Sequence, residues 1–224
     1  MTVNTKRKVN INMNFGNIMI FGDSYSTYLG YIPEGYAVYY SGKRGASPDI
    51  FDVKNTWWGR LIEASEATLV QNNSWSGSTI GYTGYGNTDC SKSSSFIYRY
   101  KKLKEEGFFE KNSVDTIFVF GGTNDSWSDA PLGEMKFSDW EEKDLFNVLP
   151  AICYFAYLLK TDLPNVKTVF IINTDIKEEI QDAMEKAAHY YSLQSVRLKD
   201  IDKLDGHPTK KGMIDICEQL LKSL

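Results

Sequence analysis

Short apolar runs alternate with longer amphipathic stretches along almost the whole chain. The runs that suit strands are 17–21, 67–70, 116–120, 166–172 and 195–198. The stretches that suit helices are 57–64, 96–106, 144–159, 176–190 and 209–221. Because nearly continuous apolar strands separated by helices are typical of a parallel sheet covered on both faces, we predict an α/β sandwich with a central parallel sheet of about five strands.

Polar segments follow the first three predicted strands directly. Ser24 comes after the first strand, Gly77 after the second and Asn124 after the third. Right-handed crossovers bring the carboxyl ends of parallel strands to one edge of the sheet, and sites in such folds lie at that edge. We therefore expect these three residues to lie near one another, although they are far apart in the sequence.

Three long stretches do not fit the simple alternation of strands and helices: 25–55, 81–95 and 126–143. Long loops in compact domains are usually functional or disordered, and these follow the strand ends, so we predict that they form the walls of a binding cleft. They and the second strand-end loop are rich in aromatic residues, namely Tyr25, Tyr28, Tyr31, Tyr36, Tyr39, Tyr40, Trp75, Tyr82, Tyr85 and Trp127. Two interpretations stay open: the rings bind sugar faces or acyl groups, or they pack the loops down.

Length and charge narrow the class of protein further. The 224 residues suit one domain, predicted over 15–224, with a flexible tail over 1–14 that includes Lys6-Arg7-Lys8. The formal net charge is -4 and there is no long basic run, so we expect no nucleic-acid partner. No apolar run approaches the roughly 20 residues that span a bilayer, and the first 14 residues do not resemble a secretory signal. We therefore expect no membrane partner and a cytoplasmic location.

The cysteines and histidines favour neither a disulfide framework nor a metal site. The three cysteines are widely spaced, and Cys153 and Cys217 lie in apolar helical stretches, where we expect them to be small core residues. Two histidines and scattered cysteines form no zinc pattern. No glycine-rich phosphate or dinucleotide motif follows a strand. We predict no metal and no organic cofactor.

Ser24 and His207 are the candidates for nucleophilic catalysis. A serine hydroxyl needs a base to take its proton, and a histidine suits this role because its pKa lies near neutral pH. Of the two histidines, His189 lies within a predicted helix, whereas His207 lies in the turn Asp205-Gly-His-Pro-Thr209 before the last helix. Gly, Pro and a capping Thr fix such a turn, so we predict that His207 faces the cleft and acts as the base.

The same chemistry needs donors for the oxyanion of a tetrahedral intermediate. Gly77 is a candidate because no side chain blocks the approach to its backbone amide. Asn124, in Gly121-Gly-Thr-Asn-Asp125, is a candidate through its side-chain amide. We interpret Asp23 and Asp125, which flank these residues, as turn-forming groups that bond nearby backbone amides.

The order of these motifs resembles the SGNH/GDSL hydrolase family. Gly-Asp-Ser follows the first strand, a Gly the second, Gly-x-Asn-Asp the third, and His-Pro precedes the last helix, so the resemblance spans 21–212. It implies a flavodoxin-like three-layer α/β/α sandwich and hydrolysis of esters or thioesters, often the deacetylation of sugars. It also implies Ser24 as nucleophile and oxyanion donor through its own amide, Gly77 and Asn124 as further donors, and His207 as base.

One position departs from the family pattern. The family usually has an Asp three residues before the His, where this chain has Leu204. Asp205 and Asp202 are the nearest acidic residues that could orient His207 and stabilise its charged form. We favour Asp205 because it lies in the same turn. Asp202, or a Ser–His dyad helped by a backbone carbonyl, is the alternative.

We therefore predict a serine esterase that hydrolyses a carboxylic ester through an acyl-enzyme on Ser24. The polar and aromatic loops favour a small acyl group, such as acetyl, on a carbohydrate-like alcohol or another small molecule. One alternative is a non-catalytic flavodoxin-like binding domain that keeps the shape of the cleft, which the missing Asp motivates. The other is an acyltransferase that uses the same site with an acceptor other than water.

Overall fold

The computed structural model describes residues 14–43 and 49–224, so the predicted tail over 1–14 lies almost entirely outside the described residues. Five parallel strands form the central sheet in the order β2-β1-β3-β4-β5. They are β1 (Asn17–Gly22), β2 (Thr68–Ser74), β3 (Thr116–Gly121), β4 (Lys167–Ile172) and β5 (Gln194–Arg197). This is the flavodoxin-like strand order, so the predicted fold class is confirmed.

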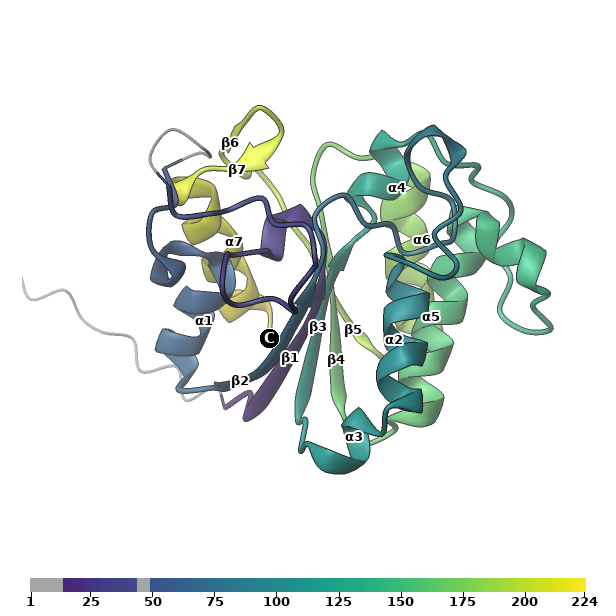
Figure 1. The fold of residues 1–224 in the computed structure, drawn as a ribbon, viewed down its shortest axis with the longest axis horizontal. Coiled ribbons are helices and arrows are strands. Elements are labelled where there is room, and N and C mark those ends of the chain that lie inside the picture. The colour runs from purple at the N-terminus through teal and green to yellow at the C-terminus, as the bar shows by residue number, and fades with distance from the viewer. Residues whose placement is uncertain (1–13, 44–48) are drawn as a thin grey trace, which may run out of the picture.

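Helices cover both faces of the sheet, which makes three layers. Figure 1 shows α1 (Trp57–Ser65) and α7 (Lys210–Ser223) on one face, and α2 (Phe96–Glu105), α5 (Val148–Asp162) and α6 (Glu178–Tyr190) on the other. Successive strand residues point to opposite faces. Thus Ile18 and Ile20 join the core under α1 and α7, whereas Met19 and Phe21 join the core under α2, α5 and α6.

The predicted strands and helices are present, with two differences of extent. The predicted helix over 144–159 is divided at the extended residue Asn147 into a 3-10 helix, η4 (Glu142–Phe146), and α5. β2 continues past the apolar run to Ser74 through polar residues. These residues stay in a strand because partners satisfy them: Asn72 Nδ2 donates to the Ser26 carbonyl at 2.8 Å, and Asn73 Oδ1 accepts from Arg99 Nη1 at 2.8 Å.

The sequence analysis did not predict several short elements, of which one lies between α2 and β3 and the others lie at the carboxyl ends of the strands (Figure 1). They are α3 (Phe108–Lys111), α4 (Thr123–Trp127) and a hairpin of β6 (Lys203–Leu204) with β7 (His207–Pro208). The hairpin has a two-residue loop, Asp205-Gly206, with φ of 50° and 78°. Positive φ at both loop residues is the mark of a type I′ turn, for which Asp-Gly is a preferred pair.

The cysteines agree with the expectation that they are small core residues. Cys90, Cys153 and Cys217 are free and buried, and Cys153 and Cys217 lie in the cores on opposite faces of the sheet. None of the helices in the described part of the chain is long and apolar enough to cross a membrane. The cytoplasmic location stays a prediction.

Candidate active site

Ser24 lies in a tight turn at the carboxyl end of β1. It is the first residue of a 3-10 helix, η1 (Ser24–Ser26), whose preceding residue, Asp23, accepts a hydrogen bond from the Tyr25 amide at 3.0 Å. This is the turn-forming role predicted for Asp23. The first amides of a helix have no helical partner, and the Ser24 N–H makes no hydrogen bond within residues 14–43 and 49–224. Only 3% of Ser24 is exposed, which leaves its hydroxyl in a largely dry setting.

The structure brings His207 to Ser24 across 183 residues of sequence. His207 Nε2 lies 3.0 Å from Ser24 Oγ, within hydrogen-bond distance. In Figure 1 the β6–β7 hairpin, which bears His207 in β7, stands beyond the carboxyl ends of the strands. A base at this distance can take the hydroxyl proton as the oxygen attacks a carbonyl carbon.

The other ring nitrogen of His207 bonds to backbone. Nδ1 lies 3.2 Å from the carbonyl oxygen of Asp205. Within residues 14–43 and 49–224, the Asp205 carboxylate makes no hydrogen bond, while Asp202 accepts one from the Thr209 hydroxyl at the start of α7. His207 could be oriented by the Asp205 carboxylate, by the Asp202 carboxylate or by a backbone carbonyl, and the geometry matches the backbone carbonyl. The reason is the type I′ turn, in which the Asp205 main chain, rather than its side chain, faces the ring.

Aromatic residues from the loop after β1 hold the histidine hairpin. The Tyr39 ring stacks on the His207 ring with a centroid distance of 3.6 Å and an interplanar angle of 8°. The Tyr25 hydroxyl donates to the Gly206 carbonyl, and the Tyr40 hydroxyl donates to the Pro208 carbonyl at 2.9 Å. Thus at least part of this loop packs the site together, as one of the two sequence interpretations proposed.

Burial lowers the pKa of His207 below its ordinary value. The nearby positive charge of Lys203 acts in the same direction, while the hydrogen bond to the Asp205 carbonyl and the Asp205 charge oppose it. A desolvated imidazole favours its neutral form, which is the form that accepts a proton. His207 is therefore in the protonation state that a base requires at neutral pH.

The segments that hold Gly77 and Asn124 reach the surroundings of this pair: Ser78 Oγ donates to the Gly22 carbonyl at 3.5 Å, and Trp127 of α4 packs edge-on against His207. Gly77 has φ of 82°, a conformation that favours glycine, and its N–H has no hydrogen-bond partner among the described residues. Asn124 lies in α4, where Nδ2 donates to the Ser78 carbonyl at 3.0 Å and Oδ1 accepts from the Tyr85 hydroxyl at 2.9 Å. The two bonds fix the orientation of the amide and leave the second Nδ2 hydrogen for another acceptor.

Asp125 ties α4 to the loop that follows Gly77. Its carboxylate accepts from the Ile80 amide at 3.0 Å and from the Gly81 amide at 3.2 Å. It is fully buried, and burial raises its pKa to about 6. As predicted, Asp125 bonds backbone amides, but these amides belong to a distant segment of the chain rather than to its own turn.

The sequence analysis did not single out Arg99 or assign specific contacts to Tyr39 and Tyr85. Arg99 is fully buried under the loop that holds Gly77, and its hydrogen bonds are described below. The sequence could have indicated a role for Arg99, because this charged residue lies on the inward face of the predicted amphipathic helix 96–106. No local pattern could have paired Tyr39 with His207 or Tyr85 with Asn124, because only the fold brings them together.

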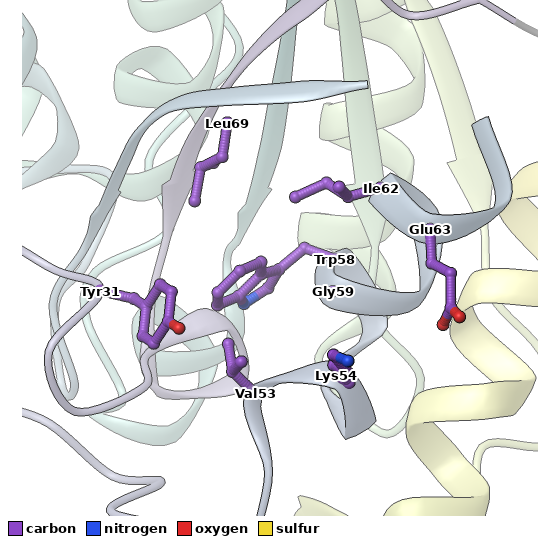
Figure 2. Close-up of a pocket in the computed structure, with 8 residues that line it drawn as sticks. All are labelled: Tyr31, Val53, Lys54, Trp58, Gly59, Ile62, Glu63 and Leu69. Carbon is purple, nitrogen blue, oxygen red and sulfur yellow. The ribbon is translucent and has the colours of Figure 1, made fainter. Parts of the chain in front are cut away.

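A cavity of about 340 Å³ lies on another part of the surface, between α1 and β2 on the face of the sheet that α1 and α7 cover. Its walls come from α1, the amino-terminal half of β2 and the short 3-10 helix η2 (Val53–Asn55). Figure 2 shows the Trp58 ring among Tyr31, Val53 and Leu69, with Lys54 and Glu63 on the opposite side. The Trp58 indole also donates to the Ser26 carbonyl at 2.9 Å, so the tryptophan is bonded to the 3-10 helix η1 that begins at Ser24.

The described part of the chain holds no group of three or more His, Cys, Asp or Glu side chains that could bind a metal ion.

Comparisons with known proteins agree with this geometry. The sequence profile of the GDSL-like lipase/acylhydrolase family matches residues 16–224. Two solved structures described as GDSL-like lipases, from Bacteroides ovatus and Bacteroides uniformis, are each 38% identical to this chain. The first superposes with a TM-score of 0.85 over 93% of this chain and 97% of the other, and the second with 0.84 over 93% and 95%. No curated protein matches.

More distant structures share the fold. An active-site mutant of a family two carbohydrate esterase from Clostridium thermocellum superposes with a TM-score of 0.61 at 15% identity, over 92% of this chain and 62% of the other. An acetyl xylan esterase from the rumen bacterium Butyrivibrio proteoclasticus gives 0.58 at 15% identity, over 94% and 63%. The family profile and the Bacteroides structures together establish that the chain belongs to the GDSL-like lipase/acylhydrolase family and is an ester hydrolase.

Proposed function

We propose that the protein hydrolyses a small acyl ester, such as an acetate, of a carbohydrate-like alcohol through an acyl-enzyme on Ser24. The single observation that supports the catalytic assignment best is the 3.0 Å contact between His207 Nε2 and Ser24 Oγ. The free Gly77 amide and the oriented Asn124 amide at the same edge of the sheet support it further.

In the proposed reaction, Ser24 Oγ forms a bond to the ester carbonyl carbon while His207 Nε2 takes the hydroxyl proton. The carbonyl electron pair moves to the oxygen, which the Ser24 amide, the Gly77 amide and Asn124 Nδ2 stabilise. The carbon–oxygen bond to the leaving alcohol then breaks, and His207 gives its proton to that alcohol. Water attacks the acyl-enzyme by the same route and releases the acid.

The nature of the site supports a small acyl group and a ring-bearing alcohol. Ser24 is nearly enclosed, which restricts the space for an acyl chain. Partly exposed rings flank it: Trp127 is 38% exposed and packs edge-on against His207, and Tyr85 is 46% exposed and bonds to Asn124. Such rings suit the apolar faces of sugars. The distant carbohydrate and acetyl xylan esterases motivate the same choice.

The test compares p-nitrophenyl acetate and acetylated sugars as substrates for the wild type and for Ser24→Ala. We expect kcat for the variant to fall by roughly 10⁴-fold or more, because one member of a nucleophile–base pair disables the pair. A serine-reactive fluorophosphonate should label the wild type and not the variant. Equal turnover by both proteins would remove Ser24 from the mechanism, and an unlabelled, inactive wild type would favour a binding domain.

The substrate class has its own measurement. We expect sugar acetates to be hydrolysed with higher kcat/KM than p-nitrophenyl esters of long acyl chains. A preference for long chains would contradict the small-acyl proposal while leaving Ser24 in place. Product analysis with an added alcohol acceptor distinguishes hydrolysis from acyl transfer, because only a transferase gives a new ester as its main product.

A further inference from the structure

Arg99 is a buried cation that the proposed mechanism does not use. It lies in α2, is 1% exposed, and packs its guanidinium over the Phe96 ring at 4.6 Å from the centroid. All five N–H donors of an arginine have acceptors here, and these are three carbonyl oxygens, one side-chain amide oxygen and one hydroxyl. Within the described residues Arg99 forms no ion pair with a carboxylate.

The acceptors lie at the carboxyl ends of the two strands nearest Ser24. Nη2 donates to the carbonyl of Gly22, the last residue of β1, at 3.3 Å. Nη1 donates to the carbonyl of Asn73 in β2, and to its side-chain oxygen at 2.8 Å. The guanidinium therefore ties together the two strand ends from which the nucleophile turn and the Gly77 loop begin.

One further contact links Arg99 to two of the three proposed oxyanion donors, Gly77 and Asn124. Nη2 donates to the Ser78 hydroxyl at 3.1 Å, and Ser78 directly follows Gly77. The Ser78 carbonyl in turn accepts from Asn124 Nδ2 at 3.0 Å. A displacement of Ser78 would therefore move the Gly77 amide and the Asn124 amide together.

The charge of Arg99 also bears on the reaction. Burial lowers the pKa of Arg99 to about 9, so the side chain stays protonated at neutral pH. The neighbouring carboxyl of Asp23 is buried as well, and burial raises its pKa to about 7. An incompletely ionised Asp23 balances the cation only in part, and a buried charge without a full partner is costly. Negative charge that develops on a nearby substrate oxygen would be stabilised by it.

We propose that Arg99 is a positioning residue for the oxyanion hole, in that its guanidinium fixes Ser78 and thereby the Gly77 and Asn124 donors, while its positive charge favours the anionic tetrahedral intermediate. The inference rests on the proposed function of Ser24. A purely structural role would differ: Arg99 would satisfy strand-end carbonyls, and its loss would lower stability without changing kcat of the folded enzyme.

The experiment measures kcat and KM for p-nitrophenyl acetate and the inhibition constant of phenylboronic acid, which forms an anionic tetrahedral adduct with a reactive serine. The variants are Arg99→Met, which keeps an unbranched apolar stem but no charge and no donor, and Arg99→Lys, which keeps the charge. Lys101→Met is the matched control, because it removes a half-buried cation from the same helix, where Lys101 bonds to the Tyr82 hydroxyl at 3.3 Å.

We expect Arg99→Met to lower kcat by about 10²-fold, with KM changed by less than about threefold and the boronate bound more weakly in parallel. Arg99→Lys should recover part of both losses, and Lys101→Met should retain wild-type kcat. Wild-type kcat and boronate affinity in folded Arg99→Met would overturn the inference alone. If the wild type itself turned over no faster than Ser24→Ala, the proposed function would fall, and this inference with it.

If Arg99→Met does not fold, Ser78→Ala decides the question. This variant removes the hydroxyl that Arg99 bonds, together with the bond of that hydroxyl to the Trp75 carbonyl at 2.7 Å, and leaves the arginine and its other acceptors in place. We expect kcat to fall several-fold with little change in KM, and an unchanged kcat would overturn the positioning role.

Discussion

The two halves of the site are held by different kinds of contact. Ser24 and Gly77 lie in the turns that follow β1 and β2, and Asn124 lies in α4. Around them, Arg99 and Asp125 bond to backbone groups of several segments. His207 lies instead on a two-stranded hairpin, held by one carbonyl, by the flat Tyr39 ring and by tyrosine hydroxyls. The donor half is thus held mainly by buried side chains that bond to backbone groups of several segments, whereas the base half depends more on the packing of aromatic rings.

This difference indicates which half tolerates change. A buried polar group that loses its hydrogen-bond partner lowers the free energy of unfolding by about 1–3 kcal/mol. In a network, the loss also weakens the neighbouring hydrogen bonds. A stacked ring contributes about 0.5–1.5 kcal/mol beyond its buried area, and another apolar side chain replaces part of it. We therefore expect substitutions in the donor half to cost more activity than those around His207.

The largest effect expected from this comparison follows Asn124→Ala. The substitution removes a proposed oxyanion donor together with the bonds to Ser78 and Tyr85. Loss of one such donor lowers kcat by about 10²–10³-fold in other enzymes, and we expect a similar loss of kcat here with p-nitrophenyl acetate. Asn124→Asp keeps the shape but has no donor and adds negative charge, so its loss should be at least as large. A threefold or smaller loss in Asn124→Ala would show that the donor half does not stabilise the oxyanion through this side chain.

A smaller effect is expected for Tyr39→Leu in the base half. Loss of the stacked ring removes about 1 kcal/mol of interaction with His207, which should raise the activation free energy by the same amount and lower kcat roughly fivefold. Tyr39→Phe keeps the ring and should match the wild type. The pH profile gives a second readout. Activity is lost as pH falls through the pKa of His207, and burial places the wild-type acid limb below the ordinary histidine pKa of about 6.5.

Removing the Tyr39 ring should admit water to the imidazole and move the acid limb of kcat/KM to higher pH, toward that ordinary value. The same limb in Tyr39→Leu and Tyr39→Phe would contradict the role of the ring in desolvating His207.

The same contrast explains what could be predicted from the sequence. The strand ends could be predicted, and with them the placement of Ser24, Gly77 and Asn124 after three neighbouring strands, because each motif is local and parallel strands align their ends by geometry. The support of His207 was not found, because Tyr39 and Tyr40 join it only through the fold. Arg99 lay within a correctly predicted helix, but its acceptors come from the ends of two other segments.

The hairpin that holds His207 could have been predicted from the sequence. Asp205-Gly206 between short extended pairs is a strong signal for a type I′ turn, and the structure has positive φ at both positions. That turn would have indicated that Asp205 is present for its backbone conformation. It would also have placed Leu204 directly opposite His207 in the β6–β7 pair.

The smallest effect is therefore expected for Asp205→Asn, the variant that most directly tests the predicted third member of a triad. Asn suits the left-handed position as well as Asp does, and the substitution leaves the carbonyl that bonds Nδ1 unchanged, so kcat should stay within about twofold of the wild type. The Asp205 charge raises the pKa of His207 slightly, so its removal should move the acid limb to marginally lower pH. Leu204→Asp is the positive control, because a carboxylate opposite His207 on the same face of the hairpin should raise that pKa and move the limb upward. A loss of a hundredfold or more in Asp205→Asn would instead make its carboxylate the partner of His207, and the base half would then depend on a charge as the donor half does.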